Sequence, residues 1–230
     1  MHIHEAMLTG SSAGIAVLCA GAAGTSIGTV IGLRHLEDEQ IPRVAVVTSA
    51  FFVVSLIHVP LGVTSVHLVL NGLVGLVLGW TAFPALLVAL LLQALLFGYG
   101  GLLALGVNTL TMALPAVVCY YLYAPWLVPH RQGSPGKPPE LPSRGVTFSA
   151  GLAAGFTAVL LGAVLTATAL WLAGDGFELL AGAVLGMHAV VAIVEGLITG
   201  SVVLFLRRVR SELLVCHVPT LVRVRPATDE

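Results

Sequence analysis

The sequence is dominated by runs of apolar residues that are long enough to cross a lipid bilayer. A membrane-spanning helix needs about 20 consecutive, predominantly apolar residues. Seven stretches of roughly this length follow one another along the 230-residue chain, at 7–33, 44–59, 63–82, 83–105, 106–123, 146–173 and 179–206. The pattern therefore predicts an all-α, polytopic membrane protein, a bundle of about seven transmembrane helices.

The composition supports lipid as the solvent of this chain. Hydrophobic residues make up 57% of it and charged residues only 9%, whereas a soluble domain carries about 25% charged residues. A soluble fold of this length could not bury so much apolar surface, because much of any chain faces its solvent. The net charge of −1 also provides no basic surface for nucleic acid.

Two polar segments divide the chain. A segment rich in Pro and Gly at about 125–145 separates the fifth apolar stretch from the sixth, and a polar tail begins at Arg207. We expect residues 1–206 to form the transmembrane domain, with 125–145 as a linker between helices, and residues 207–230 to form the tail.

The basic residues lie on one side of the predicted helices. Cytoplasmic segments of membrane proteins are enriched in Lys and Arg. With the N-terminus outside, all ten basic residues fall in inner segments: Arg34, Arg43, Arg131, Lys137, Arg144, Arg207, Arg208, Arg210, Arg223 and Arg225. The sequence therefore predicts a multi-pass protein of the cell membrane, with its N-terminus outside and its linker and C-terminus in the cytoplasm.

The first residues carry no secretory signal. Such a signal has a positively charged region ahead of its apolar stretch, and the first basic residue of this chain is Arg34. Met1 is expected to remain in the mature protein, because removal of the initiator methionine generally requires a small second residue and His2 is large. We therefore expect the mature chain to begin with Met-His.

A chain that begins with Met-His offers three nitrogens to one metal ion. The α-amine of Met1, the amide nitrogen of His2 and the His2 imidazole can form fused chelate rings. Square-planar nitrogen coordination favours Ni²⁺ or Cu²⁺, whereas Zn²⁺ prefers tetrahedral sites. Mg²⁺ and Ca²⁺ prefer oxygen, and the sequence offers no carboxylate cluster. The three cysteines lack the CxxC spacing of a thiol site.

A histidine in the third apolar stretch is the predicted fourth ligand. Thr64, His67 and Asn71 are spaced i, i+3 and i+7, so they would share one face of a helix that starts at the outer surface. We expect His67 to complete a planar set with Met1 and His2. Candidates for the hydrogen bonds that orient these ligands are His4, Thr64, Asn71 and Asn108. His4 is alternatively a further ligand or a solvated residue.

A few other polar groups lie in the apolar stretches, where an ionisable group is costly and usually faces the bundle interior. Hydrogen bonds between helices are the simpler interpretation of His58, His188 and Gln93, and His58 can also reach water. Glu195 lies two helical turns from His188. The pair either relays ions or protons, or ties helices together.

Four blocks of the sequence resemble the NikM/CbiM family, the substrate-binding membrane components of energy-coupling-factor transporters for nickel and cobalt. They follow the family's order: Met1-His2-Ile3 with Glu5, residues 62–67 with Asn71-Gly72, residues 95–108, and residues 188–199. The resemblance implies a seven-helix component whose N-terminus is threaded into the bundle, with Met1, His2 and His67 as metal ligands. His4 and Ala6 depart from the usual start of the family.

The resemblance also implies partners. These are a membrane coupling subunit, a pair of cytoplasmic ABC-type ATPases and, often, a small accessory membrane protein. The sequence has no Walker motif (GxxxxGK followed by Ser or Thr), so we expect no ATP site in this chain and ATP hydrolysis by another chain.

We therefore expect a substrate-binding component, not an enzyme, that captures extracellular Ni²⁺ for ATP-driven uptake. Co²⁺ stays open as the substrate, because both ions accept nitrogen ligands. The alternative from another class is a membrane-embedded zinc enzyme built on His67, His188 and Glu195, for which the usual HExxH spacing is absent. A scaffold subunit that binds no metal is the third alternative.

Overall fold

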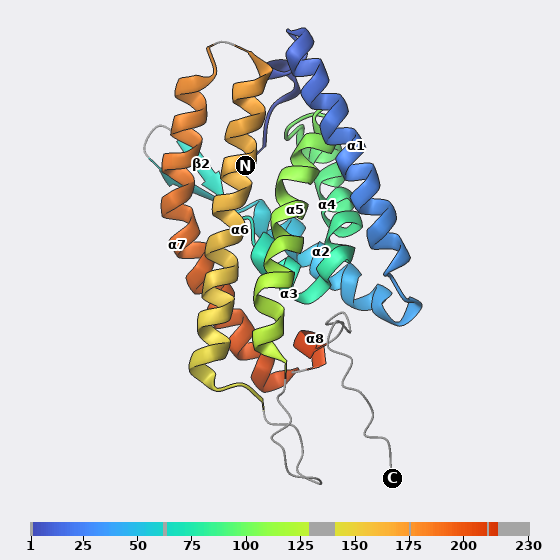
Figure 1. Cartoon of the computed structure of the whole chain (residues 1–230), viewed down its shortest axis with the longest axis vertical. Helices are drawn as coiled ribbons and strands as arrows, with labels where there is room; N and C mark the ends of the chain where they lie inside the picture. The colour runs from blue at the N-terminus through green and yellow to red at the C-terminus, as the bar shows by residue number, and fades with distance from the viewer. Residues whose placement is uncertain (1, 62–63, 129–140, 175, 211, 216–230) are drawn as a thin grey trace, which may run out of the picture.

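The computed structural model describes residues 2–61, 64–128, 141–174, 176–210 and 212–215. Helices dominate this part of the chain (Figure 1). Five helical segments in it are long and apolar enough to cross a membrane: Ser12–Arg34, Asn71–Phe97, Leu105–Leu127, Arg144–Ala173 and Glu178–Val209. The chain is therefore a multi-pass membrane protein.

The described elements alternate between long helices and short connections. In chain order the helices are α1 (Ser12–Arg34), α2 (Ile41–Ser55), α3 (Asn71–Leu78), α4 (Ala82–Phe97), α5 (Leu105–Tyr123), α6 (Arg144–Ala173), α7 (Glu178–Val209) and α8 (Glu212–Val215). Strands β1 (His58–Leu61) and β2 (Thr64–His67) pair as an antiparallel hairpin between α2 and α3. Short 3-10 turns lie at Glu5–Met7, Asp38–Gln40, Gly79–Thr81 and Ala124–Leu127.

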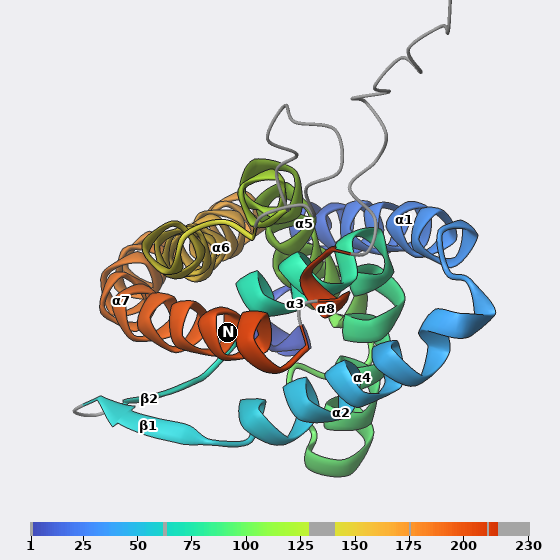
Figure 2. The same ribbon diagram turned by 90° about the horizontal axis from the view of Figure 1, so that it is seen from below.

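The short helix α3 lies inside the bundle. Seen from below, α7, α6, α5, α1, α4 and α2 lie around it (Figure 2). Every residue of α3 except Leu73 is buried. The helix therefore packs against protein on nearly all sides, and the longer helices around it provide the surface that faces lipid.

Glycine allows the helices to approach closely at two crossings. Gly75 of α3 lies against the carbonyl of Ala116 in α5, and a Cβ at this position would overlap that oxygen. Gly28 of α1 lies against the ring of Phe83 in α4 in the same way. Close backbone approach through small residues is typical of helices that associate in lipid, where van der Waals packing drives association.

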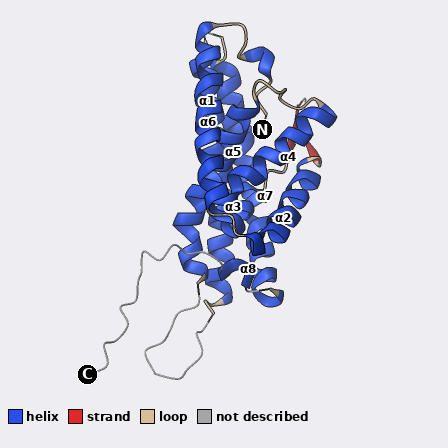
Figure 3. Ribbon diagram, turned by 90° about the vertical axis from the view of Figure 1, so that its right-hand side faces the viewer, coloured by secondary structure: helices blue, strands red, loops and turns tan. Residues whose placement is uncertain are grey.

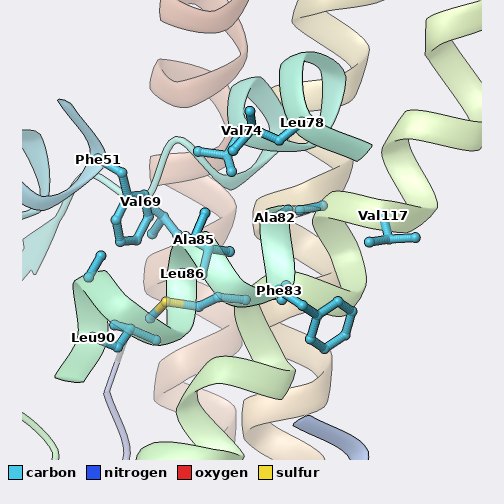
Figure 4. Close-up of a cluster of buried hydrophobic side chains, with 14 of the residues drawn as sticks. Phe51, Val69, Val74, Leu78, Ala82, Phe83, Ala85, Leu86, Leu90 and Val117 are labelled. Atoms are coloured by element: carbon cyan, nitrogen blue, oxygen red, sulfur yellow. The ribbon is translucent and has the colours of Figure 1, made fainter. Parts of the chain in front are cut away.

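A hydrophobic cluster joins the inner helices to one another (Figure 4). It is formed by side chains from α2, α3, α4 and α5 and from the segment before α3, including Phe51, Val69, Val74, Leu78, Ala82, Phe83, Ala85, Leu86, Leu90 and Val117. These side chains hold α3 and α4 together across the turn at Gly79–Thr81.

Ser11 fixes the start of α1 and joins it to α6. Its Oγ accepts a hydrogen bond from the N–H of Gly14 at 2.9 Å and donates one to the carbonyl of Ala173 at 2.6 Å. Serine is a preferred residue at this capping position. The first residue of α1 and the last residue of α6 are therefore held at the same end of the bundle.

The prediction of one helix over 63–82 is wrong. Residues Thr64–His67 form strand β2, and α3 begins only at Asn71; the hairpin lies at one side of the helices (Figure 3). Thr64, His67 and Asn71 therefore do not share a helical face. The β-branched residues Thr64 and Val66 favour extended backbone, and pairing with β1 satisfies the backbone polar groups on one edge of β2.

The predicted count of seven spans is not confirmed. Helix α2 has 15 residues, fewer than the roughly 17 that a spanning helix needs. The predicted stretches 7–33, 83–105, 106–123, 146–173 and 179–206 correspond to α1, α4, α5, α6 and α7. Much of the predicted linker and tail, 129–140 and 216–230, lies outside the described residues.

Candidate functional site

The segment before α1 folds back into the bundle. Ile3 is 2% exposed and Leu8 is fully buried, and both belong to a cluster with Val107 of α5 and Leu170 of α6. Figure 1 shows this segment in dark blue, beside α6 and α5. Ile3 and Leu8 therefore anchor this segment in the packed interior, whereas His4, Ala6 and Met7 between them are exposed.

Asn108 of α5 holds the backbone of Ile3 by two hydrogen bonds. Its Oδ1 accepts the N–H of Ile3 at 2.8 Å, and its Nδ2 donates to the carbonyl of Ile3 at 3.0 Å. The side-chain amide thus pairs with this residue as a neighbouring strand would. Because Ile3 directly follows His2, the pairing also fixes the position of His2.

The segment between α4 and α5 holds Glu5. The N–H of Glu5 donates to the carbonyl of Gly100 at 2.8 Å, and its carboxylate accepts the N–H of Leu103 at 2.9 Å. Gly101 has a φ of +82° and lies directly against the Glu5 side chain, where a Cβ would overlap the carboxylate. Only glycine meets both demands, the left-handed backbone and the close contact.

His4, a predicted candidate for orienting the ligands, points outward. Its side chain is exposed, and its Nδ1 accepts the N–H of Ala6 at 3.3 Å. This bond caps the 3-10 turn at Glu5–Met7. The position agrees with the interpretation of His4 as a solvated residue.

The His2 imidazole contacts a buried glutamine. His2 Nε2 lies 2.9 Å from Oε1 of Gln93 in α4. Gln93 is fully buried, and its Nε2 donates to the hydroxyl of Ser55 at the end of α2. The ring of Tyr99 lies beside the imidazole, with 5.9 Å between the ring centroids.

The sequence indicates Gln93 as a residue that joins helices, but it does not indicate the contact with His2. The bond to Ser55 does join α4 to α2. The missed contact spans 91 positions of the sequence. A signal was present, because Gln93 is the one polar side chain in the sequence of α4.

The donor atoms of two of the three predicted ligands lie outside the described part of the structure. Met1 lies outside the described residues. His67 is the last residue of β2, and the backbone pairing puts it opposite His58 of β1; the side chains of both, and of Thr64, lie outside the described part. The predicted donors whose positions are described are therefore the amide and the imidazole of His2.

Asn71 lies at the first turn of α3. Its Nδ2 approaches the carbonyls of Met112 in α5 and Ala158 in α6 at 3.4 and 3.3 Å. Its Oδ1 is buried and has no hydrogen-bond partner among the described residues. Asn71 therefore joins three helices, whereas Asn108 contacts the N-terminal segment itself.

Glu195 joins α7 to the segment between β2 and α3. Its carboxylate is fully buried and accepts the N–H groups of Val69 and of Leu70, the latter at 2.8 Å. His188, two turns away, shares a hydrogen bond of 2.7 Å between its Nδ1 and the carbonyl of Val184 in its own helix. These bonds agree with the interpretation that Glu195 ties parts of the bundle together.

Most of the chain is similar to a known family of transmembrane proteins. The family model described as CbiM, cobalt uptake substrate-specific transmembrane region, matches residues 2–213. A solved structure described as a transition metal transporter superposes with a TM-score of 0.72 over 91% of this chain and 93% of that chain, at 26% identity.

Curated relatives agree in sequence. A protein of Haemophilus influenzae whose name describes metal transport is 49% identical over 129 residues, 56% of this chain. The fused nickel transport protein NikMN of Rhodobacter capsulatus is 43% identical over 82 residues, 35% of this chain. The matched segments cover 60% and 24% of those two relatives, so the chain spans less than two thirds of their lengths.

Proposed function

The chain belongs to the CbiM family of cobalt uptake transmembrane regions, and we propose from this premise that it is the substrate-binding component of an energy-coupling-factor importer for Ni²⁺. At the coarser level, it is a transmembrane component of nickel or cobalt uptake. In the proposal, the chain lies in the cell membrane. Its N-terminus faces outside and captures the ion there.

One observation carries the proposal: the N-terminal segment is packed and hydrogen-bonded inside the bundle. Ile3 is buried and paired on both of its backbone polar groups by Asn108. A terminal segment with no role in the interior has no need of such contacts, because chain ends are usually poorly ordered unless tied down. This arrangement supports the proposal that the amide and the imidazole of His2 are held in a fixed geometry for binding an ion.

The donor set determines which ions fit. In the proposal, the ligands are the amine of Met1, the amide and imidazole of His2, and the imidazole of His67. Four nitrogens in a plane suit Ni²⁺, whereas Zn²⁺ favours a tetrahedral set. Co²⁺ is the second candidate, because the family description names cobalt uptake.

Transport requires other chains in this proposal. The sequence has no Walker motif, so a membrane coupling subunit and cytoplasmic ABC-type ATPases would drive release of the ion into the cell. A small accessory membrane protein would complete the importer.

The decisive experiment compares metal binding by the untagged protein with binding by a protein extended before Met1. We expect the untagged protein, purified in detergent, to bind about one Ni²⁺ per chain. The extended protein should lose that ion, because the nitrogen of Met1 is then a peptide nitrogen and the free amine lies several residues away. The same extension placed after Glu230 is the control. Equal Ni²⁺ content in the two extended proteins would refute the N-terminal site.

A pair of variants tests the fourth ligand. We expect His67→Ala to bind Ni²⁺ much more weakly than the unmodified protein. His58→Ala is a matched control, because the hairpin pairs the two positions directly and both variants disturb the same element. Competition between Ni²⁺ and Co²⁺ on the unmodified protein then measures which ion is preferred.

A further inference from the structure

We infer that Gln93, oriented by Ser55, holds the His2 imidazole in the tautomer that has its proton on Nε2, so that Nδ1 carries the lone pair that a metal needs. The inference rests on the proposed function, since it concerns how His2 is prepared for the ion. It assigns a positioning role to two residues that do not reach the metal themselves.

The direction of the hydrogen bonds follows from Ser55. The Ser55 hydroxyl lies 2.8 Å from the carbonyl of Phe52, which can only accept, so the one hydroxyl proton is donated there. The Ser55 oxygen must then accept from Gln93, and this bond places the NH₂ group of the glutamine at Ser55. The glutamine oxygen is consequently the atom that faces His2.

An amide oxygen at His2 determines which ring nitrogen is protonated. Oε1 of Gln93 has no proton to donate, so His2 Nε2 must donate at 2.9 Å. In a neutral imidazole the other nitrogen then has the lone pair. The chain of bonds from Phe52 through Ser55 and Gln93 thus specifies Nδ1 as the basic nitrogen of His2.

Nδ1 is also the nitrogen that a chelate with the backbone requires. An ion bound to the amide nitrogen of His2 closes a small ring through Cα, Cβ, Cγ and Nδ1 of the same residue. Nε2 lies on the far side of the imidazole and cannot close that ring. The tautomer held by Gln93 is therefore the one that can bind without first moving its proton.

The burial of Gln93 and Ser55 strengthens the preference of His2 for the tautomer with its proton on Nε2. Gln93 is fully buried and Ser55 nearly so, so water does not compete for the bond between them, and the half-buried His2 reaches a buried oxygen. In the opposite tautomer, the bare Nε2 would face the glutamine oxygen, and two acceptors would lie together without a proton between them. Histidine ligands in proteins commonly donate their second ring N–H to such a partner, and loss of the partner typically weakens metal binding about 10–100-fold.

The test measures Ni²⁺ affinity and the tautomer in parallel, with the full chain in detergent. Gln93→Leu removes the acceptor, and we expect its affinity for Ni²⁺ to fall about 10–100-fold. Gln93→Glu keeps an oxygen acceptor for Nε2–H but loses the NH₂ group that bonds Ser55, and we expect it to bind Ni²⁺ more tightly than Gln93→Leu. Histidine labelled with ¹⁵N distinguishes the protonated nitrogen from the bare one, and we expect the His2 signals of metal-free Gln93→Leu to show both tautomers.

Ser55→Ala tests the orientation of the glutamine. Without the serine oxygen, the amide can turn its NH₂ toward His2 and favour the opposite tautomer, so we expect weaker binding here as well. Ser49→Ala is the matched control: Ser49 is exposed on the same helix, and its hydroxyl bonds the carbonyl of Ala45. We expect this variant to bind Ni²⁺ as the unmodified protein does.

The outcomes separate this inference from the proposed function. Unchanged affinity and an unchanged His2 tautomer in Gln93→Leu would overturn the inference, even in a protein whose binding depends on the free N-terminus. Should Gln93→Leu fail to fold, Ser55→Ala decides in its place, and unchanged affinity with an unchanged His2 tautomer in that variant would overturn the inference. Insensitivity of the unmodified protein to an N-terminal extension would instead remove the proposed site as a whole.

Discussion

Ile3 and Asn108 are 105 positions apart in the sequence, yet one side-chain amide pairs with both backbone polar groups of the other residue. The pairing attaches the beginning of the chain to α5, one of the central helices of the bundle. It anchors the first residues at the buried Ile3, and the attachment can be tested by substitution.

Asn108→Ala should release the N-terminal segment. The variant leaves the N–H and carbonyl of the buried Ile3 unpaired, at a cost of about 1–3 kcal/mol for each group. We therefore expect Ni²⁺ affinity to fall about 10-fold or more. Equilibrium dialysis against Ni²⁺ measures this. Thr168→Ala is the control, because Thr168 is exposed and bonds only the carbonyl of Val164 in its own helix. Equal affinities would show that the pairing does not position His2.

Gly101→Ala should weaken Ni²⁺ binding more than Gly98→Ala. Both glycines have a positive φ, +82° and +70°, so the backbone strain of alanine is similar at the two positions. A Cβ at Gly101 would meet the carboxylate of Glu5, whereas a Cβ at Gly98 meets nothing within 4 Å. The difference between the two dissociation constants reports the contact with Glu5. A difference of zero would contradict its role in holding the N-terminal segment.

Glu195→Ala should destabilise the bundle. The substitution leaves the N–H groups of Val69 and Leu70 unpaired in the protein interior, and we expect a loss of at least about 2 kcal/mol. Thermal unfolding in detergent, followed by circular dichroism, measures the change. Glu195→Gln keeps an oxygen acceptor and should be less harmful. Glu178→Gln, at the exposed start of the same helix, is expected to leave the melting temperature unchanged.

Gly75→Ala should prevent correct packing of α3. The added methyl group overlaps the carbonyl of Ala116 in α5, and backbone atoms cannot move aside as a flexible side chain would. We expect loss of folded protein on size-exclusion chromatography. Gly182→Ala in α7 meets nothing within 4 Å and should be tolerated, because alanine is the better helix former by about 1 kcal/mol.

Ni²⁺ capture should weaken as the pH falls. The proposed ligands bind only after they lose their protons, so protons compete with the ion. Imidazole has an ordinary pKa of about 6.5, and we expect the affinity to fall steeply between pH 7.5 and about pH 5.5. A pH indicator in weakly buffered solution should record proton release when Ni²⁺ is added at neutral pH. A pH-independent affinity would argue against ligation by amine and imidazole.

The long helices could be predicted from the sequence, because uninterrupted apolar runs such as 146–173 and 179–206 leave few other possibilities in lipid. The hairpin could not. Val59, Thr64 and Val66 are as apolar or as small as residues of a spanning helix, and hydropathy does not record whether a segment faces lipid or protein. Only the structure shows that the chain forms a hairpin at the side of the bundle and then enters the protein interior as α3 (Figure 3).

The surroundings of His2 were beyond sequence reasoning for a different reason. The local chemistry of Met-His can be worked out from two residues, but the partner at Gln93 depends on how α4 is rotated relative to the N-terminal segment. No pattern within α4 specifies that rotation. A lone polar residue in an apolar helix indicates a buried contact, and only the folded chain identifies what it touches.

The break between β2 and α3 has a consequence for how the chain can sit in a membrane. Val69 and Leu70 lie between β2 and α3 and are buried, so their N–H groups need an acceptor that neither a helix nor lipid supplies. Glu195 reaches across from α7 and supplies the missing acceptors for Val69 and Leu70. One acidic side chain of α7 therefore allows the polypeptide to leave regular geometry between β2 and α3 without leaving these two buried peptide groups unpaired.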